Sequence, residues 1–412
     1  MELMTKYQYT YFIYPYLIGK CGYQKYMQKL LKNKKCKLKI FEKEKDMHLY
    51  QYFLPDIRNF AFWSFGLKKD SLREFEQLNI GLKSKLLSEH ECNVFQYELK
   101  KDIQGKVGQD GGIFFDISEI KIICFKTGIC FLLFKTNLPE DKSFTDILNF
   151  NYKFREINSK TYSMKDYENI RLQSDMFKDI TEISDLIKDI TGDSSEYRKI
   201  NFDNEKMMVY SYCCLDQNFW NDDTEDEIID SMFEKYRMIF PAGKQMSDKI
   251  GEKKSTQILD SKYVRYGISS YGTVLLTSDV QTQNYTTIAQ KFESEYLYTY
   301  ILELYKKLLL KTISQNFNKT GNFKKVEQSF LKFTKNLWIQ ELTEDEFGNV
   351  LASRWSEYLK TEEIFFRLKN KYDILYKKYN VEEVSQKNGK FAIAIVVLIV
   401  IGVINLLMQM IS

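Results

Sequence analysis

The chain has 412 residues, of which 44% are hydrophobic and 15% are aromatic, and its formal net charge is +4. This apolar content is enough for a substantial core and excludes a disordered chain, while the length predicts two or three structural units. Basic residues (60) and acidic residues (56) nearly balance, so the charge pattern excludes the usual signature of a nucleic-acid-binding protein.

The seven cysteines and two histidines do not form the spacing of a metal or catalytic motif. None of the cysteines belongs to a CxxC pair, and His48 and His90 stand in charged sequence without an obvious partner. The stretch Gln104–Gly112 lacks the spacing of a phosphate-binding loop, so a surface turn is predicted there. The sequence therefore predicts no enzyme, no zinc site and a reduced, cytoplasmic environment for the thiols.

The first predicted elements are a strand and a helix. Tyr9–Gly19 is dense in β-branched and aromatic residues, which favours a strand, and the segment that follows it has helical spacing. Residues 116–141 predict two apolar strands joined by a turn at Lys126–Gly128. A helix is expected next, because Ser143 is a suitable N-cap and Asp146 follows three positions later.

A second α/β stretch repeats this order of elements. Residues 206–216 predict a strand, residues 222–240 a helix with an acidic first turn, and residues 262–279 a hairpin that turns near Ser270–Gly272. Both hairpins lead through a polar turn into a helix, which indicates either a duplicated unit or a chance similarity, since similar hairpins often arise independently. The sequence therefore predicts an α/β domain over residues 1–285, with two related halves if the duplication holds.

The acidic run at the start of the second helix is the candidate metal site. Hard divalent cations prefer carboxylate oxygens, but the run lacks the spacing of an EF-hand loop. Acidic residues in a first helical turn are also what the helix dipole favours. The sequence predicts no cofactor unless a divalent cation such as magnesium binds here, through Asp222, Asp223, Glu225 and Asp226.

From residue 286 the predicted character changes to helices, which form a stalk over residues 286–388. Residues 292–317 keep an apolar face, a second helix covers 324–340, and Thr343–Glu346 fits a capping box that opens a third. The last helix of the stalk carries an apolar stripe that needs a partner, either a neighbouring helix or another subunit, as in a coiled coil. The stripe consists of Ile364, Leu368, Tyr372, Leu375 and Tyr379.

The run Phe391–Ile411 contains no charged side chain, and a helix of its length rises about 30 Å, the thickness of the hydrocarbon core of a bilayer. A buried core helix is the alternative, but such a helix usually has one polar stripe, and this run has none wide enough. A transmembrane anchor is therefore predicted over residues 389–412. Lys387 and Lys390 precede it, which predicts a single-pass protein of an inner or plasma membrane with most of its chain in the cytoplasm.

The predicted fold class is an α/β cytosolic domain followed by an α-helical stalk and a single C-terminal transmembrane helix. Two stretches of the stalk are EYLYTYILELYKKLLLKTISQNF (Glu295–Phe317) and FLKFTKNLWIQELTEDEFGNVLASRWSEYLK (Phe330–Lys360). Together with the preceding hairpin, YGISSYGTVLLTSD, they resemble CorA-like membrane proteins. The resemblance covers about the last third of the chain, and the α/β part by architecture.

Transporters of that family have two spans, assemble as pentamers around the first span and move divalent cations, which a Gly-Met-Asn signature after that span selects. This chain has IGVINLL at the corresponding place, with Gly402 and Asn405 three positions apart inside the apolar run, and no second span follows. The resemblance therefore implies the architecture and not magnesium transport.

The predicted span has one face of small and polar residues. Such a face predicts a helix–helix seam in a homo-oligomer, where the amides of Asn405 and Gln409 could line a pore. Alternatively, Gln409 reaches the headgroups and Asn405 is tolerated near that interface. The face consists of Ala394, Leu398, Gly402, Asn405 and Gln409.

Two functions follow from these expectations, and both have the lipid bilayer and further copies of the chain as partners, without nucleic acid. The first is an oligomeric CorA-like membrane protein whose cytosolic regulatory domain controls ion permeation or a membrane-effector activity. The alternative is a non-conducting, tail-anchored scaffold or interaction protein.

Overall fold

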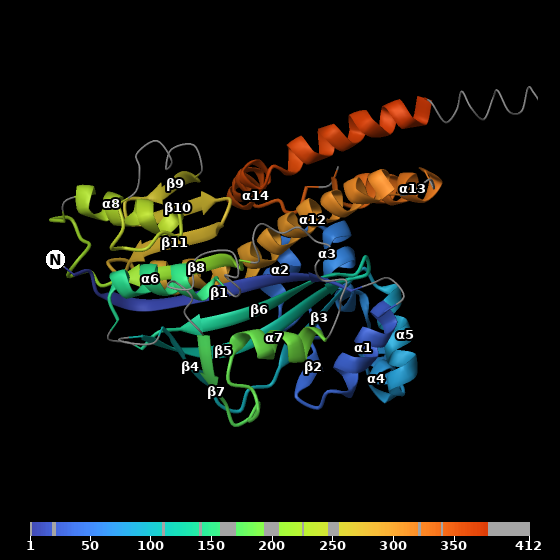
Figure 1. The fold of residues 1–412 in the computed structure, drawn as a ribbon, viewed down its shortest axis with the longest axis horizontal. Coiled ribbons are helices and arrows are strands. Elements are labelled where there is room, and N and C mark those ends of the chain that lie inside the picture. Colours follow the sequence, from blue (N-terminus) through green and yellow to red (C-terminus); the bar gives the residue numbers. More distant parts are fainter. Residues whose placement is uncertain are drawn as a thin grey trace, which may run out of the picture.

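β-branched and aromatic residues form a single mixed sheet, which is the middle layer of the fold (Figure 1). The computed structural model describes residues 2–18, 22–108, 112–139, 142–156, 170–192, 206–224, 226–245, 255–319, 323–338 and 341–377. Within these ranges the strands pair in the order β2-β3-β5-β6-β1-β8-β11-β10-β9, and β4 pairs with β5 and β7. They are β1 (Thr5–Leu17), β2 (Cys36–Leu38), β3 (Cys92–Tyr97), β4 (Ile103–Val107), β5 (Ile113–Phe125), β6 (Ile129–Asn137), β7 (Ile170–Gln173), β8 (Met208–Leu215), β9 (Ser255–Ser261), β10 (Val264–Ser269) and β11 (Gly272–Ser278).

The central strand β1 runs antiparallel to both of its neighbours, β6 and β8. Tyr11 lies opposite Lys135 on β6 and opposite Tyr210 on β8. Among the described strands, only β8 and β11 form a parallel pair. Helices cover both faces of β1, so its residues are buried at every position from 9 to 16. This burial explains why the strand has an almost continuous apolar and aromatic sequence.

Two layers of helices cover the sheet. One face, called here the α6 face, packs against α1, α5, α6, α7 and α8. The opposite face, called the α12 face, packs against α2, α3, α11, α12, α13 and α14. The helices are α1 (Tyr23–Lys32), α2 (Met47–Tyr52), α3 (Pro55–Ala61), α4 (Lys69–Gln77), α5 (Ile80–Glu89), α6 (Phe144–Phe154), α7 (Ile183–Thr191), α8 (Asp226–Arg237), α10 (Thr282–Tyr285), α11 (Thr287–Lys291), α12 (Leu297–Lys319), α13 (Phe323–Phe333) and α14 (Glu346–Leu359).

Two short-range predictions from the sequence are confirmed. The turn between β5 and β6 contains Gly128 at φ +91°, a left-handed conformation that favours glycine. Ser143 and Asp146 form a complete capping box at the start of α6, in which each side chain bonds to the backbone of the other residue. Local turn and capping chemistry therefore determines where these elements begin.

The capping box predicted at Thr343–Glu346 is wrong. The N-cap of α14 is Asp345, whose carboxylate accepts a hydrogen bond from the backbone of Gly348 at 2.6 Å. The hydroxyl of Thr343 instead donates to the backbone oxygen of Tyr52 at 2.6 Å. Gly348 is required there, because a Cβ at this position would lie 2.3 Å from the hydroxyl of Tyr52.

Tyrosines on the central strands hold the segment before α12 against the sheet. The hydroxyl of Tyr9 donates to the backbone oxygen of Ala289 at 2.9 Å, and the hydroxyl of Tyr210 donates to that of Phe292 at 2.7 Å. This part of the chain includes a π-helical turn, η5 (Phe292–Tyr296), which departs from regular α-helical bonding. Buried carbonyl groups need a donor, and the tyrosine hydroxyls supply it.

The prediction of a separate helical stalk over residues 286–388 is wrong, because α12 packs in the core of the domain. Leu304, Tyr305 and Leu308 on this helix are at most 1% exposed and belong to the core of the α12 face. The helix therefore packs along the sheet as part of the same core (Figure 1). Its apolar residues face strands and other helices rather than a partner subunit.

The predicted membrane architecture is also corrected. Within the described ranges, none of the helices is both long enough and apolar enough to cross a bilayer. In place of the predicted single-pass fold, the described residues form a mixed α/β fold with an open sheet. The predicted membrane localisation and ion transport are thus without a spanning helix in these ranges. The segment 389–412, on which those predictions depended, lies outside the described residues.

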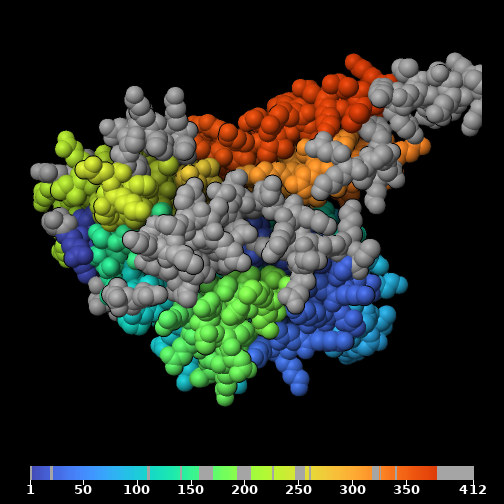
Figure 2. Space-filling view, viewed as in Figure 1, coloured from blue at the N-terminus to red at the C-terminus, as the bar shows by residue number. Residues whose placement is uncertain are grey.

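The last described helix, residues 361–377, extends along one side of the molecule beside α13 (Figure 2). Phe365 stacks on Trp338 with 3.8 Å between the ring centroids, and the hydroxyl of Tyr372 donates to Glu327 on α13 at 3.1 Å. Leu368 is 2% exposed in the same contact, and Ile364 packs against this core. The partner of the apolar stripe is thus α13 of the same chain, so the stripe gives no argument for another subunit.

Candidate functional site

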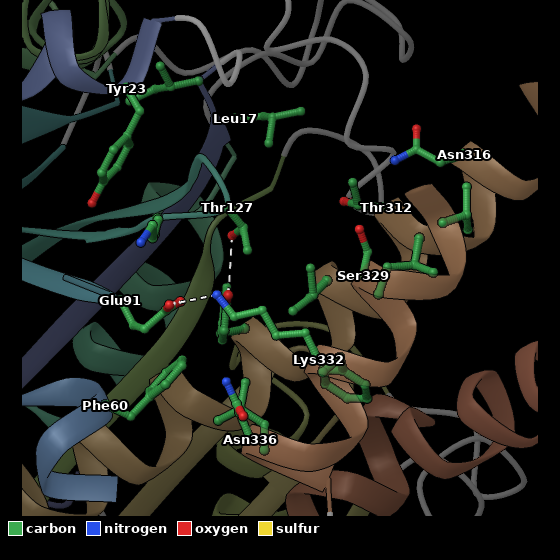
Figure 3. A pocket seen from close by; sticks show the side chains of 18 of the residues that line it. Leu17, Tyr23, Phe60, Glu91, Thr127, Thr312, Asn316, Ser329, Lys332 and Asn336 are labelled. Carbon is green, nitrogen blue, oxygen red and sulfur yellow. Dashed lines mark hydrogen bonds and ion pairs between the residues drawn. The ribbon is translucent and has the colours of Figure 1, made fainter. Parts of the chain in front are cut away.

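A cavity of about 880 Å³ lies between the sheet and the helices α12 and α13 (Figure 3). Six parts of the chain form its wall: the end of β1, the start of α1, α3, the segment from α5 to β3, the β5–β6 turn, and the helices α12 and α13 with the π-helix η6 (Thr334–Trp338) that follows α13. Its apolar lining includes Leu17, Phe60, Tyr305, Leu309, Ile313 and Val326. Its polar lining includes Glu91, Lys126, Thr127, Thr312, Ser329 and Lys332.

The sheet side of the cavity is fixed by a tight contact between two chain segments. The backbone of Ile18, just after β1, donates to the backbone oxygen of Gly128 at 2.7 Å. A Cβ at Gly128 would lie 2.0 Å from the backbone oxygen of Ile18, so only glycine allows this approach. The neighbouring Thr127 accepts a hydrogen bond from the hydroxyl of Tyr305 at 3.2 Å, which ties the turn to α12.

An ion pair crosses the cavity. Lys332 on α13 extends toward Glu91 on the sheet side, with 2.7 Å between Nζ and Oε1 (Figure 3). The lysine side chain is 56% exposed, so solvent screens this pair and its contribution to stability is small. The pair instead links the two walls of the cavity, and the charges of Glu91 and Lys332 neutralise each other.

A second cation, Lys126, gives the lining its net positive charge. Its Nζ donates to the backbone oxygen of Glu89 at 2.8 Å, and it forms no ion pair with any carboxylate of the described residues. Since Glu91 is already neutralised by Lys332, the charge of Lys126 is left over. A cavity with apolar walls and one spare cation is suited to an apolar molecule with an acidic group.

The histidine nearest this lining has a structural role. The ring of His90 stacks on Trp63 with 4.1 Å between centroids and 2° between planes. Burial lowers the pKa of His90, and the nearby Lys126 lowers it further, against the opposing effect of Glu89. The imidazole is therefore neutral near pH 7 and packed face to face with an indole, which leaves it poorly placed as a general base.

The described cysteines are buried thiols. Burial raises the pKa of Cys36 to about 12 and that of Cys214 to about 11, and it raises the pKa of Cys124 well above its usual value. A thiol acts as a nucleophile or metal ligand through its thiolate form, which such pKa values suppress at neutral pH. Cys124 and Cys130 lie on paired strands and act as small core residues, as their sequence context predicts.

The acidic run proposed as a metal site lies at the start of α8, on the α6 face. Asp222 accepts hydrogen bonds from Lys262 and, at 2.6 Å, from the hydroxyl of Tyr263, and these bonds lower its pKa. Asp223 is exposed, Glu225 lies outside the described residues, and the side chain of Asp226 is not described. In the described part of the chain, no three His, Cys, Asp or Glu side chains gather as metal ligands.

The remaining predicted residues lie near the end of the described ranges or outside them. Leu375 lies toward the end of the last described helix, and Tyr379 is outside the described residues. The residues of the predicted helix–helix seam also lie outside the described residues: Ala394, Leu398, Gly402, Asn405 and Gln409.

The sequence contained one local signal for the cavity that the predictions missed. Ser329, Lys332 and Asn336 recur at spacings of three and four, so they share one face of α13 and the π-helical segment that follows it. They stand beside the buried Phe333 and Leu337. A polar stripe next to an apolar one marks the boundary of a buried surface, although it does not say what the polar residues face.

Comparison with known proteins finds no matching family model and no similar curated protein. The resemblance to CorA-like proteins therefore stays a prediction from the sequence.

Proposed function

We propose that this chain is a non-catalytic binding protein whose cavity takes an amphipathic small molecule with an acidic group. The apolar part of the ligand would pack against Leu309, Ile313 and Val326, and its acidic group would bind Lys126. The observation that supports the proposal is the combination of an 880 Å³ cavity, apolar walls and a cation without a described ionic partner. Ligand cavities of proteins usually measure roughly 300–1,000 Å³.

The apolar walls would supply most of the affinity. Burial of apolar surface contributes about 25 cal/mol per Å², so a ligand that buries about 200 Å² gains roughly 5 kcal/mol before the costs of association. A hydrogen bond to a charged group adds about 1.5–3 kcal/mol. Lys126 would therefore orient the ligand and select its charge, while the apolar contacts would hold it.

The chemistry of the lining supports binding rather than catalysis. The described residues that line the cavity include neither a cysteine nor a histidine. Its carboxylate, Glu91, is paired with Lys332 and is not free to act as a base. Serine and threonine hydroxyls are present, but a hydroxyl nucleophile needs an adjacent base.

Fluorescence titration with 8-anilinonaphthalene-1-sulfonate tests the proposal, because this probe combines an apolar ring system with an anion. The folded protein should bind it saturably at one site, with decanoate as a competitor. Ser329→Trp fills the cavity and should weaken binding by about tenfold or more, which is ~1.4 kcal/mol. Leu331→Trp, at a 52% exposed position on the same helix, is the matched control and should bind as the parent does.

A separate variant, Lys126→Met, tests whether Lys126 binds the acidic group of the ligand. Lys126→Met keeps the length of the side chain and removes its charge, so it should weaken the anionic probe and leave a neutral analogue, N-phenyl-1-naphthylamine, unaffected. Equal probe binding by the parent and by Ser329→Trp would show that the cavity is not the site. Equal loss of both probes in Lys126→Met would show that charge selection is wrong.

A further inference from the structure

Arg155, at the end of α6, is a buried cation without a counter-charge. The residue is 5% exposed, and neither Nε nor Nη1 has a hydrogen-bond acceptor. It forms no ion pair with any carboxylate among the described residues. Its guanidinium lies over the ring of Tyr271, with 4.6 Å from Cζ to the ring centroid. The ring covers one face of the guanidinium, while Nε and Nη1 are left without an acceptor.

Such an arrangement is costly for the empty protein. A charge removed from water needs a partner of opposite sign, and a buried N–H donor needs an acceptor. Burial lowers the pKa of Arg155, with a smaller opposing effect from the adjacent Glu156. Glu156 does not neutralise it, because this carboxylate is bonded to Lys206.

Two lysines, Lys206 and Lys244, lie near the C-terminal end of α6. Lys206 pairs with Glu156 in an isolated β-bridge, and Glu156 directly follows Arg155 in the chain. Lys244 lies over the ring of Tyr152, one turn earlier on α6, at 5.5 Å from the ring centroid. Because Lys206 is neutralised by Glu156, Lys244 is the cation of the described residues here that would help Arg155 to attract an anion.

The position of Arg155 at a helix C-terminus offers a simpler explanation. The negative end of a helix dipole favours a cation there, and Arg155 is the C-cap residue of α6. The dipole, however, supplies no acceptor for Nε and Nη1, which stay unbonded. The backbone oxygen of Arg155 is already bonded to the backbone of Met207 at 2.8 Å, so the main chain is held without help from the side chain.

We propose that Arg155 is the receptor of a second, separate binding site, which takes an oxyanion such as a phosphate or carboxylate group. The anion would accept two hydrogen bonds from N–H groups of the guanidinium, while the ring of Tyr271 packs against the face of the guanidinium and keeps its plane in place. This site lies at the end of α6 and does not depend on the cavity beside α12. It would bind either a free anion or the acidic group of a larger molecule.

Thermal unfolding in sodium phosphate against sodium chloride of equal ionic strength tests the site. The parent should gain about 2 °C in Tm near tenfold excess over the dissociation constant. Arg155→Met should show no gain, and in chloride its Tm should equal or exceed that of the parent, because the uncompensated charge is gone. Arg354→Met, which removes an exposed arginine, is the control and should keep the phosphate response.

Two results would overturn the proposal: an unchanged phosphate response in Arg155→Met, or a lower Tm of this variant in chloride, which would mark a structural arginine. If Arg155→Met does not fold, Arg155→Lys decides, since it keeps the charge but loses the two-pronged donor edge. It should broaden the phosphorus-31 resonance of phosphate about tenfold less than the parent at equal concentration. Adenosine monophosphate in place of phosphate separates the two sources: tighter binding indicates a larger ligand, and equal binding indicates the free anion.

Discussion

The ring of Tyr305 on α12 lies parallel to the ring of Phe125 at the end of β5, with 3.8 Å between centroids and 10° between planes. Tyr305 is 1% exposed, and its hydroxyl reaches the β5–β6 turn through Thr127. One side chain thus joins the long helix, the sheet and the wall of the cavity. The helix belongs to the core because contacts of this kind recur along its length.

Tyr305→Ala should therefore destabilise the fold strongly. Removing a large buried aromatic side chain costs about 3–5 kcal/mol, because apolar contacts are lost and a void remains. Urea unfolding followed by circular dichroism measures the loss. Tyr376→Ala, at a 43% exposed position, is the control and should change stability by less than about 0.5 kcal/mol. Similar losses in both variants would contradict the assignment of α12 to the core.

The tight turn at Gly128 gives a second prediction. Gly128→Ala should destabilise the protein by more than about 1 kcal/mol, because φ is positive there and the new Cβ would meet the backbone oxygen of Ile18. Gly243→Ala is the matched control, since a Cβ at Gly243 has nothing within 4 Å. Urea midpoints of the two variants decide the matter. A Gly128→Ala protein as stable as the Gly243→Ala protein would refute the close approach.

Asn151 on α6 forms a buried polar link to the central strands. Its side-chain oxygen accepts from the hydroxyl of Thr10 at 3.0 Å, and its amide donates to the hydroxyl of Ser211 at 3.0 Å. Asn151→Ala should cost about 2–3 kcal/mol, because the buried hydroxyls of Thr10 and Ser211 each lose one of their hydrogen-bond partners. Guanidinium unfolding measures the effect, with Asn218→Ala, at an exposed position, as the control. A loss below about 0.5 kcal/mol would show that water replaces the amide.

The buried thiols predict a loss of stability at high pH. The pKa of Cys36 is raised to about 12 in the folded protein, and a thiol in the unfolded chain titrates near 8.5. Between these values the unfolded chain releases a proton that the folded protein keeps, so stability is full below about pH 8.5 and falls as the pH rises toward 12. Urea midpoints at pH 8, 9 and 10 measure the slope.

Cys36→Ala is the control for this slope. It removes one of the titrating groups, so its stability should fall less steeply above pH 9 than that of the parent. An identical slope in both proteins would mean that Cys36 keeps an ordinary pKa after folding. Other buried thiols and tyrosines would still contribute to the remaining slope.

Features encoded by neighbouring residues were predictable from the sequence. The turn at Gly128 and the capping box of Ser143 and Asp146 depend on residues within four positions of each other, so the local pattern specifies them. The start of α14 shows the limit of this approach. Thr343 matched the pattern of a cap, but its hydroxyl bonds to Tyr52, which is 291 positions away.

The position of α12 and the cavity beside it could not be predicted in the same way. The sequence pattern of an apolar helix is the same whether the helix covers a sheet of its own chain or packs against another subunit. Periodicity identifies a buried face but not the partner of that face. The cavity joins residues as distant as Leu17 and Asn336, and no local spacing connects them. The unpaired Arg155 was equally hidden, since burial and missing partners are properties of the folded chain.

The tyrosines that hold the segment before α12 bind it through its main chain. Tyr9, Tyr210 and Tyr212 donate to the backbone oxygens of residues 289, 292 and 284. Every amino acid has the same backbone carbonyl group, so these hydrogen bonds do not depend on which side chains the accepting residues carry. The residues of this segment can therefore vary widely in evolution. The tyrosines on the sheet cannot, because no other side chain carries a hydroxyl donor at the same distance from the backbone.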